Sequence, residues 1–188
     1  MIITISGPCG SGKSTIAKAI QKEFNTERIY VGGMRREYAT KLGMSLNELN
    51  KYALEHPESD VKIDNIAAQK ARELSKNNIV VVEGRTQYHF LPESLKLYIK
   101  CDMDAGAKRI WNHLKEDKSR NEGKADSLEE LKKLEIEREQ NDLARYKKYY
   151  NIDHNDESQY DHVIDTTNIT ADQATEKILE LLRNNLKS

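Results

Sequence analysis

The chain has almost no excess charge and no long hydrophobic run. Its 188 residues are 32% charged, yet the formal net charge is only -1, so it offers neither a broad basic field for nucleic acid nor a polybasic patch for membranes. No apolar run approaches the roughly 20 residues that span a bilayer. Because a strand-like run starts at residue 2, we expect no signal peptide before it. We expect a cytoplasmic monomer with one α/β domain that binds neither nucleic acid nor membranes.

Signatures of several other protein classes are also missing. The chain has two cysteines, Cys9 and Cys101, and their positions in a glycine-rich segment and at the end of a strand-like run argue against a disulfide. No His and Cys spacing suggests zinc. Neither Asp-x-x-Gly nor Asn-Lys-x-Asp occurs, which argues against a guanine-nucleotide switch. No second signature suggests a transporter or helicase ATPase.

The sequence does contain the spacing of a phosphate-binding loop, between a strand-like run at 2–5 and a helix-like run from residue 15. Glycines let backbone N–H groups crowd a polyphosphate, and the start of a helix adds the positive end of its dipole. Lys13 can place its charge between the β and γ phosphates, and the hydroxyl of Ser14 can ligate Mg²⁺. A simple glycine-rich turn would need neither this pair nor the flanking elements. We assign nucleoside triphosphate binding to Gly7, Pro8, Cys9, Gly10, Ser11, Gly12, Lys13, Ser14 and Thr15.

Hydrophobic periodicity predicts the order of strands and helices. Short apolar runs predict strands at 2–5, 28–31, 79–82, 95–100 and 161–165. Helical spacing predicts helices at about 15–24, 34–42, 45–55, 60–76, 105–115, 127–149 and 171–182, with Ser45, Asp60 and Ser127 as N-caps. This alternation predicts a five-stranded parallel sheet with helices on both faces and ligands at the carboxyl ends of its strands.

Two polar stretches stand out near the end of this pattern. Residues 116–126 have no apolar side chain larger than alanine, which predicts a mobile segment. Residues 137–142 have no apolar stripe, so we expect the middle of their helix to lie outside the core.

Arginines follow the second and third strand-like runs. Glu83-Gly84-Arg85 ends the third, where the glycine permits close approach of a ligand and the arginine can fork onto a phosphate or a base edge. Arg36 follows the second run as another candidate for a phosphate clamp, although its neighbour Arg35 makes that assignment ambiguous. A polar strand end with a solvated arginine is the alternative explanation.

Further arginines lie on the later helices. Arg138 and Arg145 are seven residues apart, so they share one helix face about 10 Å apart along the axis, and a transferring phosphoryl group could lie across both. Arg109 adds a third guanidinium near the polar segment. By spacing alone, a charged solvent face explains these arginines equally well.

The candidate arginines indicate which kind of acceptor would receive the phosphoryl group. A sugar or other alcohol would need a base to accept its proton, whereas a nucleotide phosphate is already largely ionised at neutral pH, since its second pKa is about 6. Such an acceptor needs only cationic clamps, and the sequence supplies clamps.

With these residues identified, the chain resembles nucleoside monophosphate kinases, and most closely the archaeal type of cytidylate kinase, within the P-loop NTPase superfamily. The resemblance spans nearly the whole length. Its most specific strings are Arg36-Glu37-Tyr38-Ala39, Gly43-Met44-Ser45-Leu46, His56-Pro57-Glu58, Val82-Glu83-Gly84-Arg85, Glu137-Arg138-Glu139 and Ala144-Arg145-Tyr146-Lys147.

The resemblance implies a three-layer fold in one domain, with a core at 1–33, 77–115 and 146–188, a monophosphate-binding segment at 34–76 and a lid at 116–145. It implies Mg²⁺-dependent transfer from ATP to CMP or dCMP, which gives ADP and the diphosphate. Thr166 and Thr167 match the turn near the adenine. The implied acceptor site is Arg36, Asp64, Glu83, Gly84 and Arg85, and the implied catalytic residues are Lys13, Arg109, Arg138 and Arg145.

This chain departs from the family pattern in three places. His113 stands where a second arginine is expected four residues after Arg109, so we expect Lys118 or Arg120 in the longer lid to supply the charge. Arg35 stands where the family pattern leads us to expect an apolar residue before Arg36. Asp60, Asp64 and Arg85 are all available to read the base, so AMP, UMP or a small metabolite remains an alternative acceptor, and a regulatory ATPase remains an alternative function.

Overall fold

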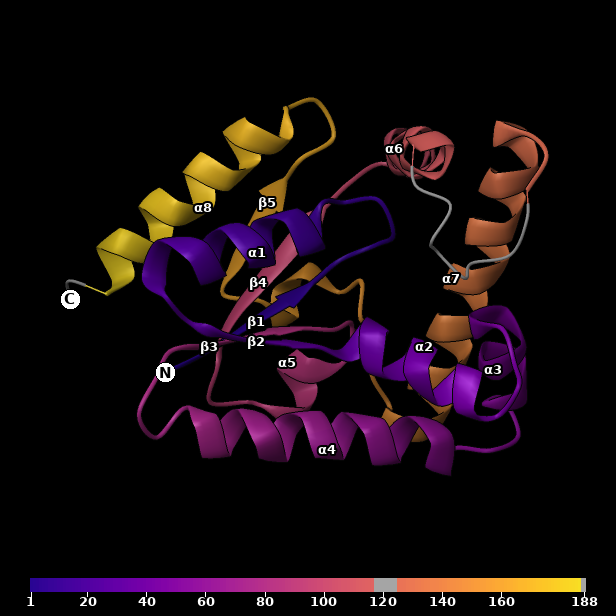
Figure 1. Cartoon of the computed structure of the whole chain (residues 1–188), viewed down its shortest axis with the longest axis horizontal. Coiled ribbons are helices and arrows are strands. Elements are labelled where there is room, and N and C mark those ends of the chain that lie inside the picture. The colour runs from indigo at the N-terminus through magenta and orange to yellow at the C-terminus, as the bar shows by residue number, and fades with distance from the viewer. Residues whose placement is uncertain (117–124, 187–188) are drawn as a thin grey trace.

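The polypeptide forms a parallel sheet with helices on both faces (Figure 1). The computed structural model describes residues 1–116 and 125–186. The strand order is β2-β3-β1-β4-β5, and every neighbouring pair is parallel. The predicted fold class is therefore confirmed. The strands are β1 (Ile2–Ser6), β2 (Glu27–Tyr30), β3 (Val80–Glu83), β4 (Leu95–Lys100) and β5 (His162–Asp165).

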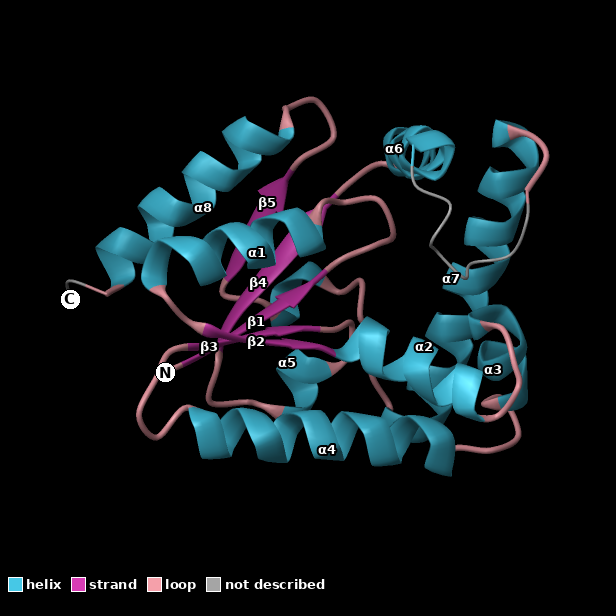
Figure 2. Cartoon of the chain, viewed as in Figure 1, coloured by secondary structure: helices cyan, strands magenta, loops and turns pink. Residues whose placement is uncertain are grey.

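The alternation of side chains along β1 explains the layers. Ile3 and Ile5 pack with α1 (Lys13–Phe24) and α8 (Ala171–Asn185) on one face. Ile2 packs on the other face with Val80, Val82 and α4 (Glu58–Leu74), because successive strand residues point to opposite sides. Figure 2 shows α4 and the short α5 (Gln87–Phe90) on the side of the sheet opposite α1 and α8. The central strands are covered on both faces, as is usual for parallel sheets.

The chain between β2 and β3 is helical, as the sequence predicts. α2 (Val31–Lys41) starts directly after β2, and therefore three residues earlier than predicted. α3 (Leu46–Tyr52) begins at the predicted cap, where Ser45 accepts a hydrogen bond from the Glu48 backbone and the Glu48 side chain bonds back to Ser45. This reciprocal capping box satisfies donors at both positions and fixes the start of the helix.

The prediction that Asp60 caps the third of these helices was wrong. α4 begins at Glu58 behind Pro57, so Asp60 lies inside its first turn. Its fully buried carboxylate accepts hydrogen bonds from Arg35 of α2 and from Arg145 of α7 (Leu128–Tyr150). Asp60 therefore joins three helices instead of capping one.

The polar middle of α7 is only partly exposed, which corrects a second prediction. The helix begins behind the predicted cap, Ser127. Gln140 is exposed, but Asp142 and the nearby Arg145 are buried. They can leave water because the two side chains pair with each other, so neither charge is buried alone.

The helix before the polar segment, α6 (Met103–Glu116), contacts α7. The predicted mobile segment lies mostly outside the described residues, and so do Lys118 and Arg120. None of the described helices is both long enough and apolar enough to cross a membrane.

Replacing Asp60 with alanine tests the buried network that joins α2, α4 and α7. Asp60→Ala should lower the free energy of unfolding by about 3–5 kcal/mol, because the guanidinium groups of Arg35 and Arg145 would stay buried without their shared carboxylate. Asp104→Ala is the matched control, since Asp104 also pairs with a cation on α7, Lys132, but its side chain is 61% exposed. An exposed pair of this kind contributes at most about 1 kcal/mol. Urea denaturation measures both variants, and equal losses would contradict the account.

Candidate functional site

A cavity of about 420 Å³ lies at the carboxyl edge of the sheet, between the glycine-rich loop, α2 and α7. It is lined by most of the residues that the sequence singled out: Cys9, Gly10, Ser11, Gly12, Lys13, Ser14, Thr15, Arg36, Asp64, Glu83, Gly84, Arg85, Arg109, Arg138 and Thr166. Four of the predicted site residues are not part of its lining: Gly7, Pro8, Arg145 and Thr167. Residues from six helices and strands, α1, α2, α4, β3, α6 and α7, thus meet at one place.

The glycine-rich loop has the backbone that its sequence predicts. Gly10 and Gly12 have φ of 73° and 95°, and α1 starts at Lys13 with Gly12 as its N-cap. The loop also packs tightly on α6, since a Cβ atom on Gly10 would lie 2.3 Å from the carbonyl oxygen of Gly106. Sequence reasoning missed Gly106, and its only local sign is that it lies between two alanines.

Lys13 lies over this loop. Its Nζ donates to the carbonyl oxygen of Pro8 at 2.5 Å. Burial, with smaller contributions from Arg85 and Arg138, lowers the pKa of Lys13 to about 8 against the opposing effect of Cys9 and Glu83. A polyanion bound here would favour the charged ammonium.

The hydroxyl of Ser14 and the carboxylate of Glu83 form one end of the cavity. Ser14 Oγ donates to Glu83 Oε1 at 2.5 Å, and Arg28 donates to Glu83 Oε2 at 2.6 Å. The resemblance implied that Glu83 belongs to the acceptor site. In the structure its carboxylate instead accepts a hydrogen bond from Ser14, the candidate Mg²⁺ ligand. No group of three or more His, Cys, Asp and Glu side chains suited to a metal occurs in the part of the chain that the structure describes. A hydroxyl and a carboxylate suit Mg²⁺ when phosphate oxygens complete its ligands.

Arg109 joins the glycine-rich loop to the turn after β5. Its guanidinium donates to the carbonyl oxygen of Thr166 at 2.6 Å and to that of Gly10 at 3.4 Å. Thr166 Oγ1 donates to the carbonyl oxygen of Ser11 at 3.0 Å, while Thr167 Oγ1 accepts from the Asp102 backbone. The turn that the sequence assigned to adenine is therefore held against the loop.

The opposite half of the cavity carries the predicted acceptor residues. Arg36 donates to the hydroxyl of Tyr30 at 2.5 Å. Arg35 lines the cavity too, and it pairs with Asp60 and donates to Asn50 Oδ1 at 2.9 Å. The departure at Arg35 thus adds a second guanidinium to this half, and the carboxylate of Asp60 balances its charge.

Asp64 is a buried carboxylate in the same half. Its Oδ1 accepts from Thr86 at 3.0 Å and from Gln87 at 2.9 Å, and its Oδ2 accepts from Tyr150 at 2.9 Å. Burial raises the pKa of Asp64 to about 6, although Arg35 and these hydrogen bonds favour the ionised form. The group therefore changes protonation near the pH at which a nucleotide phosphate takes its second charge.

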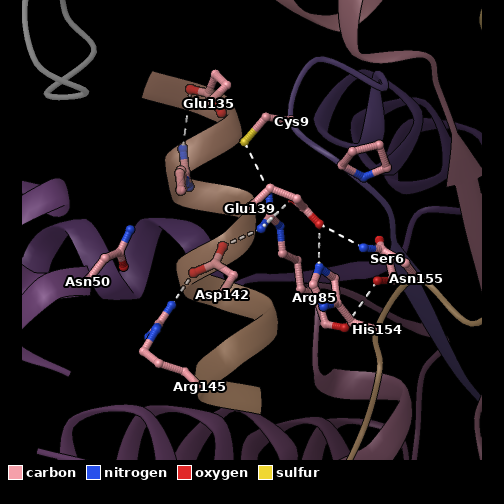
Figure 3. Close-up of polar contacts among 12 residues, drawn as sticks. Ser6, Cys9, Asn50, Arg85, Glu135, Glu139, Asp142, Arg145, His154 and Asn155 are labelled. Carbon is pink, nitrogen blue, oxygen red and sulfur yellow. Dashed lines mark hydrogen bonds and ion pairs between the residues drawn. The ribbon is translucent and has the colours of Figure 1, made fainter. Parts of the chain in front are cut away.

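Asp142 connects two of the predicted clamps. Its carboxylate pairs with Arg85 on one side and Arg145 on the other, as Figure 3 shows. Burial alone would raise the pKa of Asp142, but Arg85 and Arg145 together hold it below its ordinary value. Sequence reasoning missed Asp142, although it stands four residues after Arg138 and three before Arg145, which places the three on one helix face.

The two arginines that the sequence paired differ in position. Arg138 lines the cavity, with Nη1 3.8 Å from Glu135 Oε1. The side chain of Arg145 is fully buried between Asp60 and Asp142, away from the cavity lining. The solvent-face alternative therefore fails for both, because Arg138 is only 16% exposed.

Comparison with known proteins gives the family of the chain. A family model described as an AAA domain matches residues 3–130. Cytidylate kinase from Methanothrix thermoacetophila is 40% identical over 166 residues, which are 88% of each chain. Cytidylate kinase from Sulfurisphaera tokodaii is 37% identical over 188 residues, which cover 98% of this chain and 96% of that protein. Shikimate kinase from Acinetobacter baumannii shares the fold, with a TM-score of 0.59 and 16% identity over 98% of this chain and 93% of its own. Because relatives this similar span nearly its full length, the chain belongs to the cytidylate kinase family.

Proposed function

We propose that this protein transfers the γ-phosphoryl group of ATP to CMP and so forms ADP and CDP. One observation carries the proposal: a single cavity joins the phosphate-binding loop to guanidinium groups from α2, the end of β3, α6 and α7. Membership of the cytidylate kinase family supports CMP as the acceptor. The proposal includes dCMP as a second acceptor and a monomeric, cytoplasmic enzyme.

The donor nucleotide would occupy the half of the cavity next to α1. Backbone N–H groups of the loop and the N-terminus of α1 bind its phosphates, and Lys13 contacts the β and γ phosphates. The turn at Thr166, with Thr167 beside it, seats the adenine. Ser14 and Glu83 would hold Mg²⁺ together with phosphate oxygens, and the ion would neutralise charge that develops on the phosphates.

The acceptor would occupy the half formed by α2, α4 and the end of β3. Arg36 and Arg85 bind its phosphate, Gly84 permits its close approach, and Asp64 lies where a base edge could be read. Residues 34–76 would then form the monophosphate-binding segment, residues 116–145 the lid, and the remainder the core. The acceptor phosphate needs no general base, because it is already ionised.

Arg138 and Arg109 would stabilise the phosphoryl group during transfer. Arg138 already lines the cavity from α7, and closing of the lid over the nucleotides would exclude water. Arg145 would act indirectly, because it lies outside the cavity lining. Its ion pair with Asp60 fixes α7 to α4, and its ion pair with Asp142 holds that carboxylate beside Arg85.

A coupled assay of ADP release with AMP, CMP, dCMP, UMP and GMP tests the proposed function. We expect release that depends on an acceptor, with the highest kcat/KM for CMP. Lys13→Met is the control for contaminating activity, and it should abolish release because the loop loses its only side-chain cation. A higher kcat/KM for AMP or UMP would reassign the acceptor, and release without any acceptor would indicate a regulatory ATPase instead.

Arg138→Ala tests the role of the lid helix in catalysis. Loss of one preorganised donor to a transferring group lowers kcat about a hundredfold or more, whereas KM for ATP should change little because the loop residues bind the triphosphate. Arg183→Ala is the matched control, since Arg183 pairs with Glu23 and Glu176 on the surface around α8. Steady-state kinetics measure both variants. Wild-type kcat in Arg138→Ala would show that this guanidinium does not act on the phosphoryl group.

A further inference from the structure

A buried histidine is linked through one glutamate to Arg85, which we assign to the acceptor phosphate. His154 lies in the segment after α7, with its side chain fully buried, and its Nε2 is 2.7 Å from Glu139 Oε1. The other oxygen of Glu139 is 2.9 Å from Nη1 of Arg85. Figure 3 shows dashed lines from Glu139 to both Arg85 and His154. Arg85 lines the cavity, whereas Glu139 and His154 do not.

The hydrogen bond between His154 and Glu139 has a defined direction. A carboxylate only accepts, so Nε2 carries the proton and donates. Nδ1 is buried and has no hydrogen-bond partner among the described residues. A leucine or phenylalanine would fill the same space without leaving a polar atom unpaired. The donor to Glu139 is therefore the interaction that the imidazole makes and an apolar core residue could not supply.

The position of the imidazole is itself fixed. The hydroxyl of Tyr160 donates to the backbone carbonyl of His154 at 2.7 Å, and the ring of Tyr146 meets the imidazole edge-on, with centroids 5.2 Å apart. Asn155 Nδ2 donates to the same oxygen of Glu139 at 3.0 Å. Two neighbouring residues thus hold Oε1 in place and turn Oε2 toward Arg85.

Arg85 receives its orientation from this arrangement. Its Nη1 contacts both Glu139 and Asp142, and its Nη2 is 3.3 Å from Cys9 Sγ in the phosphate-binding loop. With Nη1 held by two carboxylates, Nη2 faces the loop, where the two nucleotides would meet. A guanidinium fixed in this way binds a phosphate with less loss of side-chain freedom.

We propose that His154 is a positioning residue for the acceptor site, which fixes Glu139 so that Glu139 aims Arg85 at the acceptor phosphate. This inference rests on the proposed function, because it assigns Arg85 to the acceptor. It predicts that changes at His154 affect the acceptor and spare ATP, whose phosphates bind elsewhere on the loop.

His154→Leu and His154→Gln separate positioning from packing. The leucine removes the donor at similar volume, and loss of one charge-assisted hydrogen bond behind the clamp should raise KM for CMP about tenfold, with KM for ATP unchanged. The glutamine amide can still donate to Glu139, so it should restore KM for CMP to near the wild-type value. Asn155→Ala removes the second donor from a less buried position and should raise KM for CMP in the same direction, which provides a variant that folds if His154→Leu does not.

A double-mutant cycle with Glu139→Gln tests whether His154 acts through Glu139. If it does, adding His154→Leu to Glu139→Gln should change KM for CMP less than twofold, because the charge that aims Arg85 is already absent. If the two substitutions raised KM for CMP independently, so that their effects multiplied in the double variant, the proposal would be overturned. An unchanged KM for CMP in His154→Leu would also overturn it, and so would a raised KM for CMP in His154→Gln. All of these measurements use a wild type that is active with CMP. If the proposed function itself were wrong, the wild type would show no dependence on an acceptor, so the two failures can be told apart.

Discussion

The structure depends on keeping several like charges close together in a small buried space. Arg35, Arg85 and Arg145 would repel one another and lose hydration if they stood alone. Two buried carboxylates prevent this, because Asp60 binds Arg35 and Arg145 while Asp142 binds Arg145 and Arg85. Each acidic side chain contacts two arginines. The guanidinium groups are thus held in place by the protein itself, and the ion pairs of Asp60 hold α2, α4 and α7 together.

This arrangement connects folding to chemistry. A phosphoryl group in transfer has negative charge on all of its oxygens, and cations that are already oriented stabilise it without reorganisation at the moment of reaction. The phosphate-binding loop supplies the fixed end of the site, since Gly10 packs against Gly106 and Lys13 starts α1. α7 supplies the other end through Arg138, which lines the cavity. In this account Asp142, Glu139 and His154 determine where Arg85 points without contacting substrate themselves.

Local signals were readable from the sequence, and distant pairings were not. The loop, the five strands and the caps at Ser45 and Ser127 follow from short-range patterns, and the structure confirms them. Asp60 looked like a helix cap because sequence shows its neighbours and not Arg145, which is 85 residues away. The middle of α7 looked like a solvent face because a buried ion pair and an exposed charge have the same composition. Asp142 could have been found from its spacing to Arg138 and Arg145, whereas nothing local marks His154.

The central claim is that one cavity holds both nucleotides with their phosphates end to end. Binding of adenosine and cytidine joined through five phosphates tests it most directly, because a linked ligand gains affinity only if both sites are engaged together. Isothermal titration calorimetry should give a dissociation constant at least a hundredfold below that of ADP or of CMP measured separately. Affinity for the linked compound equal to that for ADP alone would contradict the claim.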